Sequence, residues 1–211
     1  WRIARERLET SGAVVAVGVV AFLVLRGGGG GGTVQSVVGD ETPATVQIIS
    51  KLADGVASGS GVVVDAGDGL VLTNAHVVAG GDSFEVKPAG GEPTAATLVA
   101  SMPCDDLALL QVTDPAARSA LKTANLADPA SLEQGETVVA LGFPGSAESA
   151  SSDAEFASDQ MSATNGIVSK TSAKYVDPNS GVAPLPDTIQ HTAAINHGNS
   201  RGPLFDLDGN L

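Results

Sequence analysis

Hydrophobic residues recur along most of the chain in short runs, many of them separated by Gly, Asp or Pro. Short apolar or alternating runs with turn residues between them are typical of β-strands rather than of helices. No long segment has a helical period, and only Pro115–Lys122 is expected to form a turn or two of helix. The pattern predicts an all-β protein, either a barrel or a sandwich. The expected strands cover residues 46–51, 60–64, 70–73, 84–87, 95–99, 108–112, 138–141, 166–169, 189–193 and 203–205. Two polar segments, 146–160 and 175–187, are expected to be loops.

The N-terminal part of the chain differs in composition from the rest. Residues 11–25 carry no charge, and three arginines precede them. A basic flank before an apolar run is typical of a signal peptide or of a membrane anchor. Because no small-residue cleavage motif follows, we favour an uncleaved single-pass anchor in the cell membrane, with the folded part on the extracytoplasmic side. Residues 1–32 would then hold a cytoplasmic flank, the anchor and a flexible polyglycine tether. Residues 33–43 are expected to be a linker, and the folded part is expected to begin near Ala44.

Charge and motif content exclude several classes of function. The chain has 211 residues and a net charge of −13, and four of its eleven basic residues precede residue 27. An acidic body argues against nucleic acid as a partner, because phosphate binding needs clustered Lys and Arg. The single cysteine, Cys104, can form no internal disulfide and is expected to be a small buried apolar residue. No phosphate loop, dinucleotide fingerprint or zinc-ligand spacing occurs, so we expect no cofactor and no metal.

Three polar residues suggest a nucleophilic site. Ser200 lies among glycines just before an expected strand, in the segment HGNSRGP. A serine hydroxyl needs a neighbouring base, and a glycine-rich turn can direct the N–H groups of Gly198 and Ser200 at a developing oxyanion. His76 directly follows one expected strand, and Asp106 directly precedes another. Each residue alone is commonplace in a β protein. Together they follow the chain order His, Asp, Ser of the chymotrypsin-like peptidases.

Longer segments around these residues resemble the bacterial trypsin-like peptidases of the HtrA/Deg type. The resemblance covers about residues 59 to 211, and it rests on the segments 59–63, 72–78, 106–110, 139–145, 166–169 and 192–200. It implies a chymotrypsin-like double β-barrel, with a first barrel over 44–126 and a second barrel over 127–211 that is incomplete at its C-terminal end. It also implies polypeptide substrates among exported or misfolded proteins, and a homotrimer.

The resemblance implies a role for each site residue. His76 would act as general base and then as general acid, Asp106 would orient it, and Ser200 would attack the peptide carbonyl and form an acyl-enzyme. Ala194 would lie at the base of the substrate pocket, six residues before Ser200. Because no acidic residue is found at that position, we expect a small or medium apolar residue at the cleaved position. The other pocket residues implied by the resemblance are Ile195 and His197.

One departure from the family pattern leaves alternatives open. Arg201 replaces the glycine that usually follows the nucleophile, and it adds a Cβ and a long cation beside the expected oxyanion site. The first alternative to a serine endopeptidase is therefore a catalytically impaired pseudopeptidase that binds polypeptides as a chaperone or a sensor. The second is a non-catalytic tethered scaffold, which would leave the three polar residues unexplained.

Overall fold

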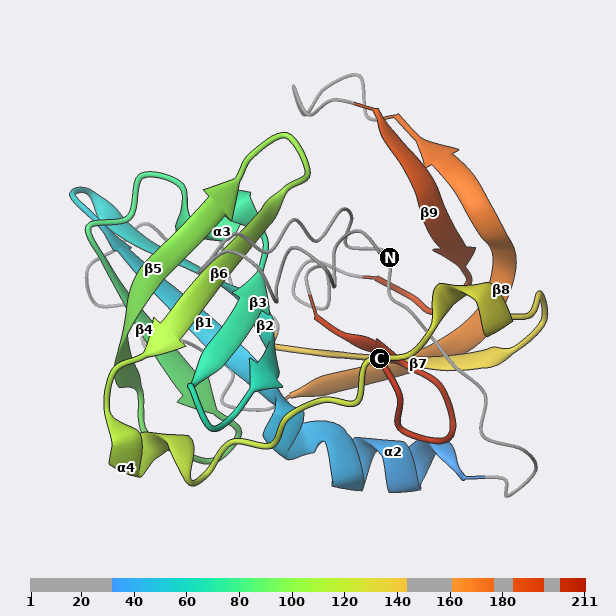
Figure 1. Cartoon of the computed structure of the whole chain (residues 1–211), viewed down its shortest axis with the longest axis horizontal. Coiled ribbons are helices and arrows are strands. Elements are labelled where there is room, and N and C mark those ends of the chain that lie inside the picture. The colour runs from blue at the N-terminus through green and yellow to red at the C-terminus, as the bar shows by residue number, and fades with distance from the viewer. Residues whose placement is uncertain (1–31, 144–160, 177–183, 196–201) are drawn as a thin grey trace, which may run out of the picture.

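The computed structural model describes residues 32–143, 161–176, 184–195 and 202–211, and its largest element is a closed six-stranded antiparallel barrel. The barrel order is β1-β2-β3-β6-β5-β4, and β1 closes it by pairing with β4. The barrel occupies the left half of Figure 1. Its strands are β1 (Thr45–Leu52), β2 (Gly55–Asp65), β3 (Leu70–Thr73), β4 (Ser83–Pro88), β5 (Thr94–Met102) and β6 (Leu107–Val112).

Alternation along these strands builds the barrel interior. On β1, Val46 and Ile48 face inward with no exposed surface, and on β6 Leu110 and Val112 do the same. Successive side chains along a strand point to opposite faces, so every second side chain is directed into the barrel. Gly61 on β2 allows the strands to pack closely, because a Cβ there would lie 2.9 Å from a Val71 methyl group.

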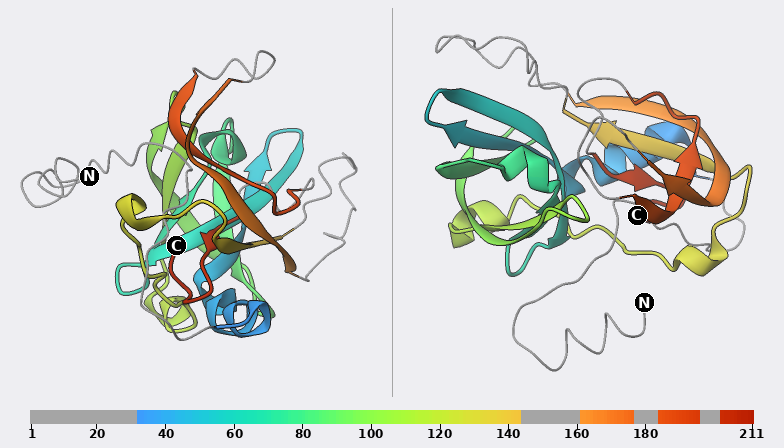
Figure 2. Two further views of the ribbon diagram at one scale, coloured as in Figure 1. Left: turned by 90° about the vertical axis from the view of Figure 1, so that its right-hand side faces the viewer. Right: turned by 90° about the horizontal axis from the view of Figure 1, so that it is seen from above.

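A second antiparallel sheet lies beside the barrel, with the order β10-β7-β8-β9 among the described residues. Its interior residues form a core of their own, around Val138 and Ala140 of β7, Val168 of β8 and Leu204 of β10. The hairpin of β8 and β9 is long, and its register shifts at three places. Figure 1 and the left view of Figure 2 show this hairpin extending away from the rest of the sheet. The strands are β7 (Thr137–Gly142), β8 (Ser162–Tyr175), β9 (Leu185–His191) and β10 (Leu204–Phe205).

A third apolar cluster joins the two sheets. Val62 of β2 meets Val139 and Leu141 of β7 and Phe205 of β10, all of them buried. Helix α2 (Val34–Glu41) closes this cluster from below in Figure 1, and it contributes the buried side chain of Val37. The barrel and the second sheet therefore pack against each other through a buried apolar cluster to which both contribute.

Helix α2 corrects the expected linker over 33–43. Thr33 caps the helix, since its hydroxyl accepts a 3.1 Å hydrogen bond from the Ser36 N–H and the Ser36 hydroxyl accepts one from the Thr33 N–H. At the other end of the helix, the Glu41 carboxylate is buried and pairs with Lys122 Nζ at 2.6 Å. The folded part thus includes Thr33 and helix α2, which precede Ala44. The helix was missed because it has only eight residues and its apolar side is defined by a cluster that other elements supply.

Each expected strand coincides with an observed one, with differences at the ends. The largest difference is at β8, which was expected over 166–169 and runs over Ser162–Tyr175. The expected loop 175–187 is also shorter than predicted, because β9 already begins at Leu185. Most side chains of this hairpin are exposed or half-buried, so this segment, which is rich in proline, has no apolar strand pattern. Cys104 is exposed rather than buried. Besides α2, the described residues form four short helices: η1 (Thr42–Ala44), α3 (Ala75–Val78), α4 (Pro115–Arg118) and η2 (Pro129–Ser131). Helix α4 confirms the helical turn that was expected within residues 115–122.

Other expectations concern segments that the structure does not describe. The expected anchor at 11–25, the polyglycine tether and the expected loop 146–160 all lie outside the described residues. Among the residues that are described, no helix is both long and apolar enough to cross a membrane. The division of the two domains between residues 126 and 127 stays a prediction.

Candidate active site

His76 is presented by a single helical turn that follows β3. Ala75, Val77 and Val78 of this turn are buried and anchor it to the barrel, whereas the His76 side chain is 45% exposed. Three apolar contacts thus fix the backbone of the turn and leave one side chain directed outward. An exposed and firmly held imidazole is suited to accept and return a proton.

Asp106 lies in the tight turn between β5 and β6. The turn is closed by hydrogen bonds from the N–H groups of Asp105 and Asp106 to the carbonyls of Met102 and Pro103. Asp106 has a φ of 52°, in the left-handed region that residues other than glycine seldom adopt. The conformation sets the carboxylate directly beside the His76 turn, although the two residues are thirty positions apart in the sequence.

Both oxygens of the Asp106 carboxylate lie within hydrogen-bond distance of His76 Nδ1. His76 Nδ1 lies 2.6 Å from Oδ2 and 2.7 Å from Oδ1, and the His76 backbone N–H donates to Oδ1 at 3.0 Å. The Asn74 amide nitrogen adds a further hydrogen bond of 3.0 Å to Oδ2. The structure therefore brings together two of the three residues expected from the sequence, and it holds their relative orientation at several points.

These contacts set the charge of the Asp106 carboxyl. Burial raises the pKa of the Asp106 carboxyl, but the hydrogen bonds from His76, its charge and the Asn74 amide outweigh burial, and the pKa lies below its ordinary value. Asp106 is therefore ionised at neutral pH. A carboxylate at Nδ1 favours the imidazole tautomer that carries its proton on Nδ1, which leaves Nε2 as a proton acceptor.

The expected pocket residues Ala194 and Ile195 follow β9, and both are exposed. The segment that carries them is attached to β8 by side chains. The Thr164 hydroxyl donates to the Ala194 carbonyl at 2.9 Å, and the Thr192 hydroxyl accepts from the Ile167 N–H at 2.9 Å. β8 can be approached this closely because residue 166 is glycine, where a Cβ would lie 2.1 Å from the Ala193 nitrogen.

The expected nucleophile lies outside the described residues. Ser200, Gly198 and His197, together with Arg201, fall within the segment 196–201, so their distances to His76 stay a prediction. The residue that follows this segment is tightly placed: Gly202 is buried, and a Cβ on it would lie 1.6 Å from the Leu141 carbonyl oxygen on β7. The described residues that flank this segment are thus held in place, by β8 before it and by β7 after it.

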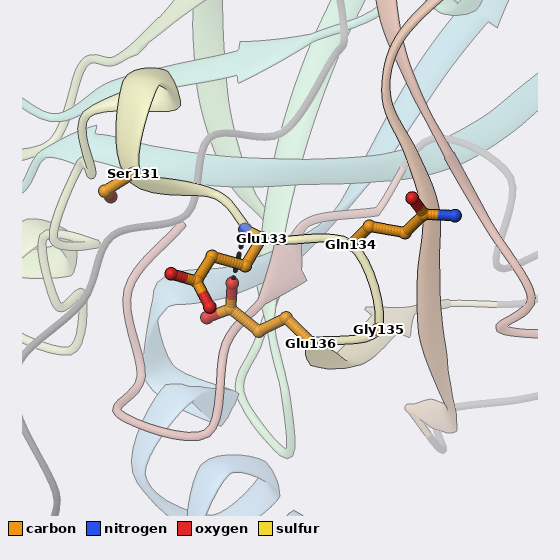
Figure 3. Close-up of a pocket in the computed structure, with 5 residues that line it drawn as sticks. All are labelled: Ser131, Glu133, Gln134, Gly135 and Glu136. Carbon is orange, nitrogen blue, oxygen red and sulfur yellow. Dashed lines mark hydrogen bonds between the residues drawn. The ribbon is translucent and has the colours of Figure 1, made fainter.

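A shallow pocket of about 400 Å³ lies elsewhere, on the turn between η2 and β7. Figure 3 shows its lining, which includes Glu133 and Glu136, with the Glu136 carboxylate accepting from the Glu133 N–H at 3.0 Å. No residue of this pocket belongs to the expected site. Within the described ranges, no group of three or more His, Cys, Asp or Glu side chains is arranged to hold a metal ion.

The structure adds polar residues that the sequence did not single out. Asn74 contacts Asp106, and Thr164 holds the Ala194 carbonyl. A signal for Asn74 was present, because an amide residue stands directly before the turn that carries His76. Thr164 had no such signal, since it lies thirty residues from Ala194 and meets it only through the sheet.

Comparisons with known proteins agree with this geometry. The family model of the trypsin-like peptidase domain matches residues 59–211. Serine protease Do-like HtrA of Bacillus subtilis is 36% identical over 73% of this chain, and the periplasmic serine endoprotease DegP of Salmonella typhimurium is 36% identical over 74%. The chain spans 32% and 29% of the length of these two relatives.

Solved structures of similar fold include two peptidases. The HtrA-type protease AlgW, solved with a tripeptide, superposes with a TM-score of 0.66 at 30% identity, and the match covers 85% of this chain and 52% of AlgW. The Rv3671c protease of M. tuberculosis in its active form superposes with a TM-score of 0.66 at 29% identity, over 83% of this chain and 70% of that protein. The resemblance found in the sequence is thereby confirmed, and the chain belongs to the trypsin-like peptidase domain family, with relatives of the HtrA type.

Proposed function

We propose that this protein is a serine endopeptidase that hydrolyses peptide bonds through His76, Asp106 and Ser200. The observation that carries the proposal is the contact of His76 Nδ1 with both oxygens of an ionised Asp106 carboxylate. This contact directs Nε2 away from Asp106, and the imidazole is exposed. Membership of the trypsin-like peptidase family supports Ser200 as the partner of Nε2.

The proposed reaction follows from these roles. Nε2 of His76 takes the proton of the Ser200 hydroxyl while the oxygen attacks the peptide carbonyl, and the Gly198 and Ser200 N–H groups hold the oxyanion. His76 then gives the proton to the leaving amine, and the acyl-enzyme forms. Water, deprotonated by His76, hydrolyses the acyl-enzyme and restores Ser200. Asp106 keeps its negative charge throughout and stabilises the imidazolium.

The substrates we propose are polypeptides of exported or misfolded proteins. The HtrA type of the relatives supports this class, and a homotrimer is the assembly we propose on the same basis. The exposed residues Ala194 and Ile195 support a pocket for a small or medium apolar side chain. The uncharged run 11–25, preceded by arginines, supports a membrane anchor with the catalytic unit on the extracytoplasmic side.

Labelling of the full chain with a fluorophosphonate probe tests the proposal. The probe reacts with activated serines, so we expect one label, located on Ser200 by mass spectrometry. Ser200→Ala should abolish it, and His76→Ala should slow it by about 10²- to 10⁴-fold. Ser101→Ala, an exposed serine on β5, is the matched control and should label like the parent.

An Arg201→Gly variant separates the two main alternatives. If the folded parent stays unlabelled and Arg201→Gly becomes labelled, Arg201 disables the nucleophile and the protein is a pseudopeptidase that binds polypeptides. If neither folded protein is labelled, Ser200 is not the nucleophile and the endopeptidase proposal is wrong.

A further inference from the structure

Asn74 occupies a position at which its side chain would ordinarily cap a helix. It is the residue before the α3 turn, its backbone is extended with φ −84° and ψ 147°, and asparagine is among the preferred capping residues. Its side chain nevertheless makes no capping hydrogen bond. Instead the Asp106 carboxylate accepts the His76 N–H, one of the amides that a capping side chain would satisfy. The Asn74 side-chain amide is therefore free to make a different contact, which is with Asp106.

That contact is with Asp106 at two points. The Asn74 Nδ2 group donates to the Asp106 backbone carbonyl and to its carboxylate Oδ2, both at 3.0 Å. Because both partners are acceptors, the nitrogen and not the amide oxygen must face them. One amide group thus links the main chain and the side chain of the same residue, and it opposes rotation of the carboxylate about its χ angles.

The two hydrogen bonds from Asn74 hold Asp106, a residue with an uncommon backbone conformation. A φ of 52° is uncommon at a residue other than glycine, and such a conformation persists where neighbouring contacts stabilise it. The backbone carbonyl of Asp106 is one of the groups that Asn74 holds. Asn74 is itself 6% exposed, so water does not replace Asp106 as its partner. Loss of the contact would leave a buried donor unsatisfied.

The position of Asn74 is in turn fixed by its neighbour. The Thr73 hydroxyl donates to the Ser60 carbonyl at 2.8 Å, and both residues are buried. This bond is additional to the pairing of β3 with β6, which ends at Thr73 and Ala108. The amide of Asn74 therefore projects from a rigid strand end rather than from a loop, and a rigid support is what an orienting contact needs.

We propose that Asn74 is the positioning residue that holds the Asp106 carboxylate in the orientation in which it binds His76 Nδ1. The inference deepens the proposed endopeptidase function and rests on it. The side-chain hydrogen bonds of Asn74 go to Asp106, so in this proposal Asn74 acts through Asp106 and not on the reacting atoms. Its removal should therefore slow the chemical step and leave substrate binding unchanged.

The test compares Asn74→Ala and Asn74→Asp with the parent, using the full chain. Active sites are first counted by titration with the fluorophosphonate probe, so that rates refer to competent sites. The rate of labelling per site and the kcat for a peptide substrate should fall about 10- to 100-fold in Asn74→Ala, with KM close to that of the parent. The proton NMR resonance of His76 Nδ1–H, which lies in a short hydrogen bond, should move upfield.

Asn74→Asp keeps the shape of the side chain and removes its hydrogen-bond donor. It is therefore the variant to measure if Asn74→Ala does not fold. A second carboxylate beside Asp106 raises the pKa of Asp106, and the acid limb of the pH–rate profile should move to higher pH. Thr45→Val is the matched control, because it removes a buried side-chain hydrogen bond, from the Thr45 hydroxyl to the Glu41 carbonyl at 3.1 Å, that involves neither Asn74 nor Asp106. It should lower stability and leave the rate per site close to that of the parent.

The outcomes separate this inference from the function on which it rests. If the parent is labelled and both Asn74 variants react at the parent's rate per site, with only the number of competent sites reduced, Asn74 is structural and the inference is wrong. A rise in KM with kcat unchanged would also overturn it. If the folded parent is not labelled at all, the endopeptidase proposal fails, and the role of Asn74 fails with it.

Discussion

The hydroxyl of Ser60, on β2 of the barrel, accepts a 2.8 Å hydrogen bond from the backbone N–H of Phe143, the residue that follows β7 of the second sheet. Both residues are buried. The Ser60 carbonyl accepts the Thr73 hydroxyl on the strand that ends before His76. One residue therefore connects the second sheet to the strand that leads to the candidate base.

Ser60→Ala should lower the free energy of unfolding by about 1–3 kcal/mol, because it leaves the Phe143 N–H buried without its side-chain acceptor. Urea unfolding followed by circular dichroism measures the change. Ser101→Ala makes the same substitution at an exposed position of β5, and it should stay within about 0.5 kcal/mol of the parent. Equal stability of the two variants would show that the bond between Ser60 and Phe143 does not join the sheets.

We expect the imidazole of His191 to make the free energy of unfolding depend on pH. Its Nδ1 atom is buried without a hydrogen-bond partner among the described residues, and burial lowers the pKa of the imidazole from its ordinary value of 6.5. The unfolded chain then binds the proton more readily than the folded protein, so stability rises with pH in this range. Stability should fall as the pH drops through 6.5 towards the lowered folded-state pKa.

Urea unfolding of the parent and of His191→Gln at several pH values checks this dependence. The variant cannot titrate at this position, so its unfolding free energy should vary less across the same pH range. An identical pH dependence in both proteins would assign the effect to another group.

Gly202→Ala should destabilise the protein by about 3 kcal/mol or more, because the added Cβ would lie 1.6 Å from the Leu141 carbonyl oxygen and β7 would have to move. Gly39→Ala provides the matched control in helix α2, where a Cβ would meet nothing within 4 Å. It should stabilise the protein by about 0.5–1 kcal/mol. Thermal unfolding measures both, and a neutral Gly39→Ala would mean that residues 34–41 are not helical in solution.

The ion pair of Glu41 and Lys122 ties helix α2 to the connection between the two sheets. Lys122 Nζ also donates to the Asp40 carbonyl at 3.0 Å, and Glu41 is 3% exposed. Lys122→Met leaves a buried carboxylate without its cation and should cost about 3 kcal/mol. Adding Glu41→Gln to Lys122→Met should restore most of that loss. A double-mutant cycle from urea unfolding tests the coupling, and purely additive effects would contradict it.

Much of the barrel follows from the sequence. Strands such as β3 and β6 were predicted within one residue at each end, because their inward side chains are apolar and turn residues bound them. His76 and Asp106 were also predicted to meet, from the family pattern around them. The helix α2 and the extension of the β8–β9 hairpin were not predicted, because neither has a local pattern strong enough to distinguish it from linker or loop.

The sequence by itself determined the all-β class, the order of the strands along the chain and the polar residues from which a catalytic site is built. These depend on local alternation and on residue chemistry, which are readable in any short segment. Only the tertiary structure decided that Asn74 faces Asp106, that Ser60 reaches the second sheet and that Glu41 is buried against Lys122. Each of these contacts joins residues that are thirty-two to eighty-three positions apart. Such pairs are set by how the sheets and the helix pack together, and no local pattern in the chain encodes that packing.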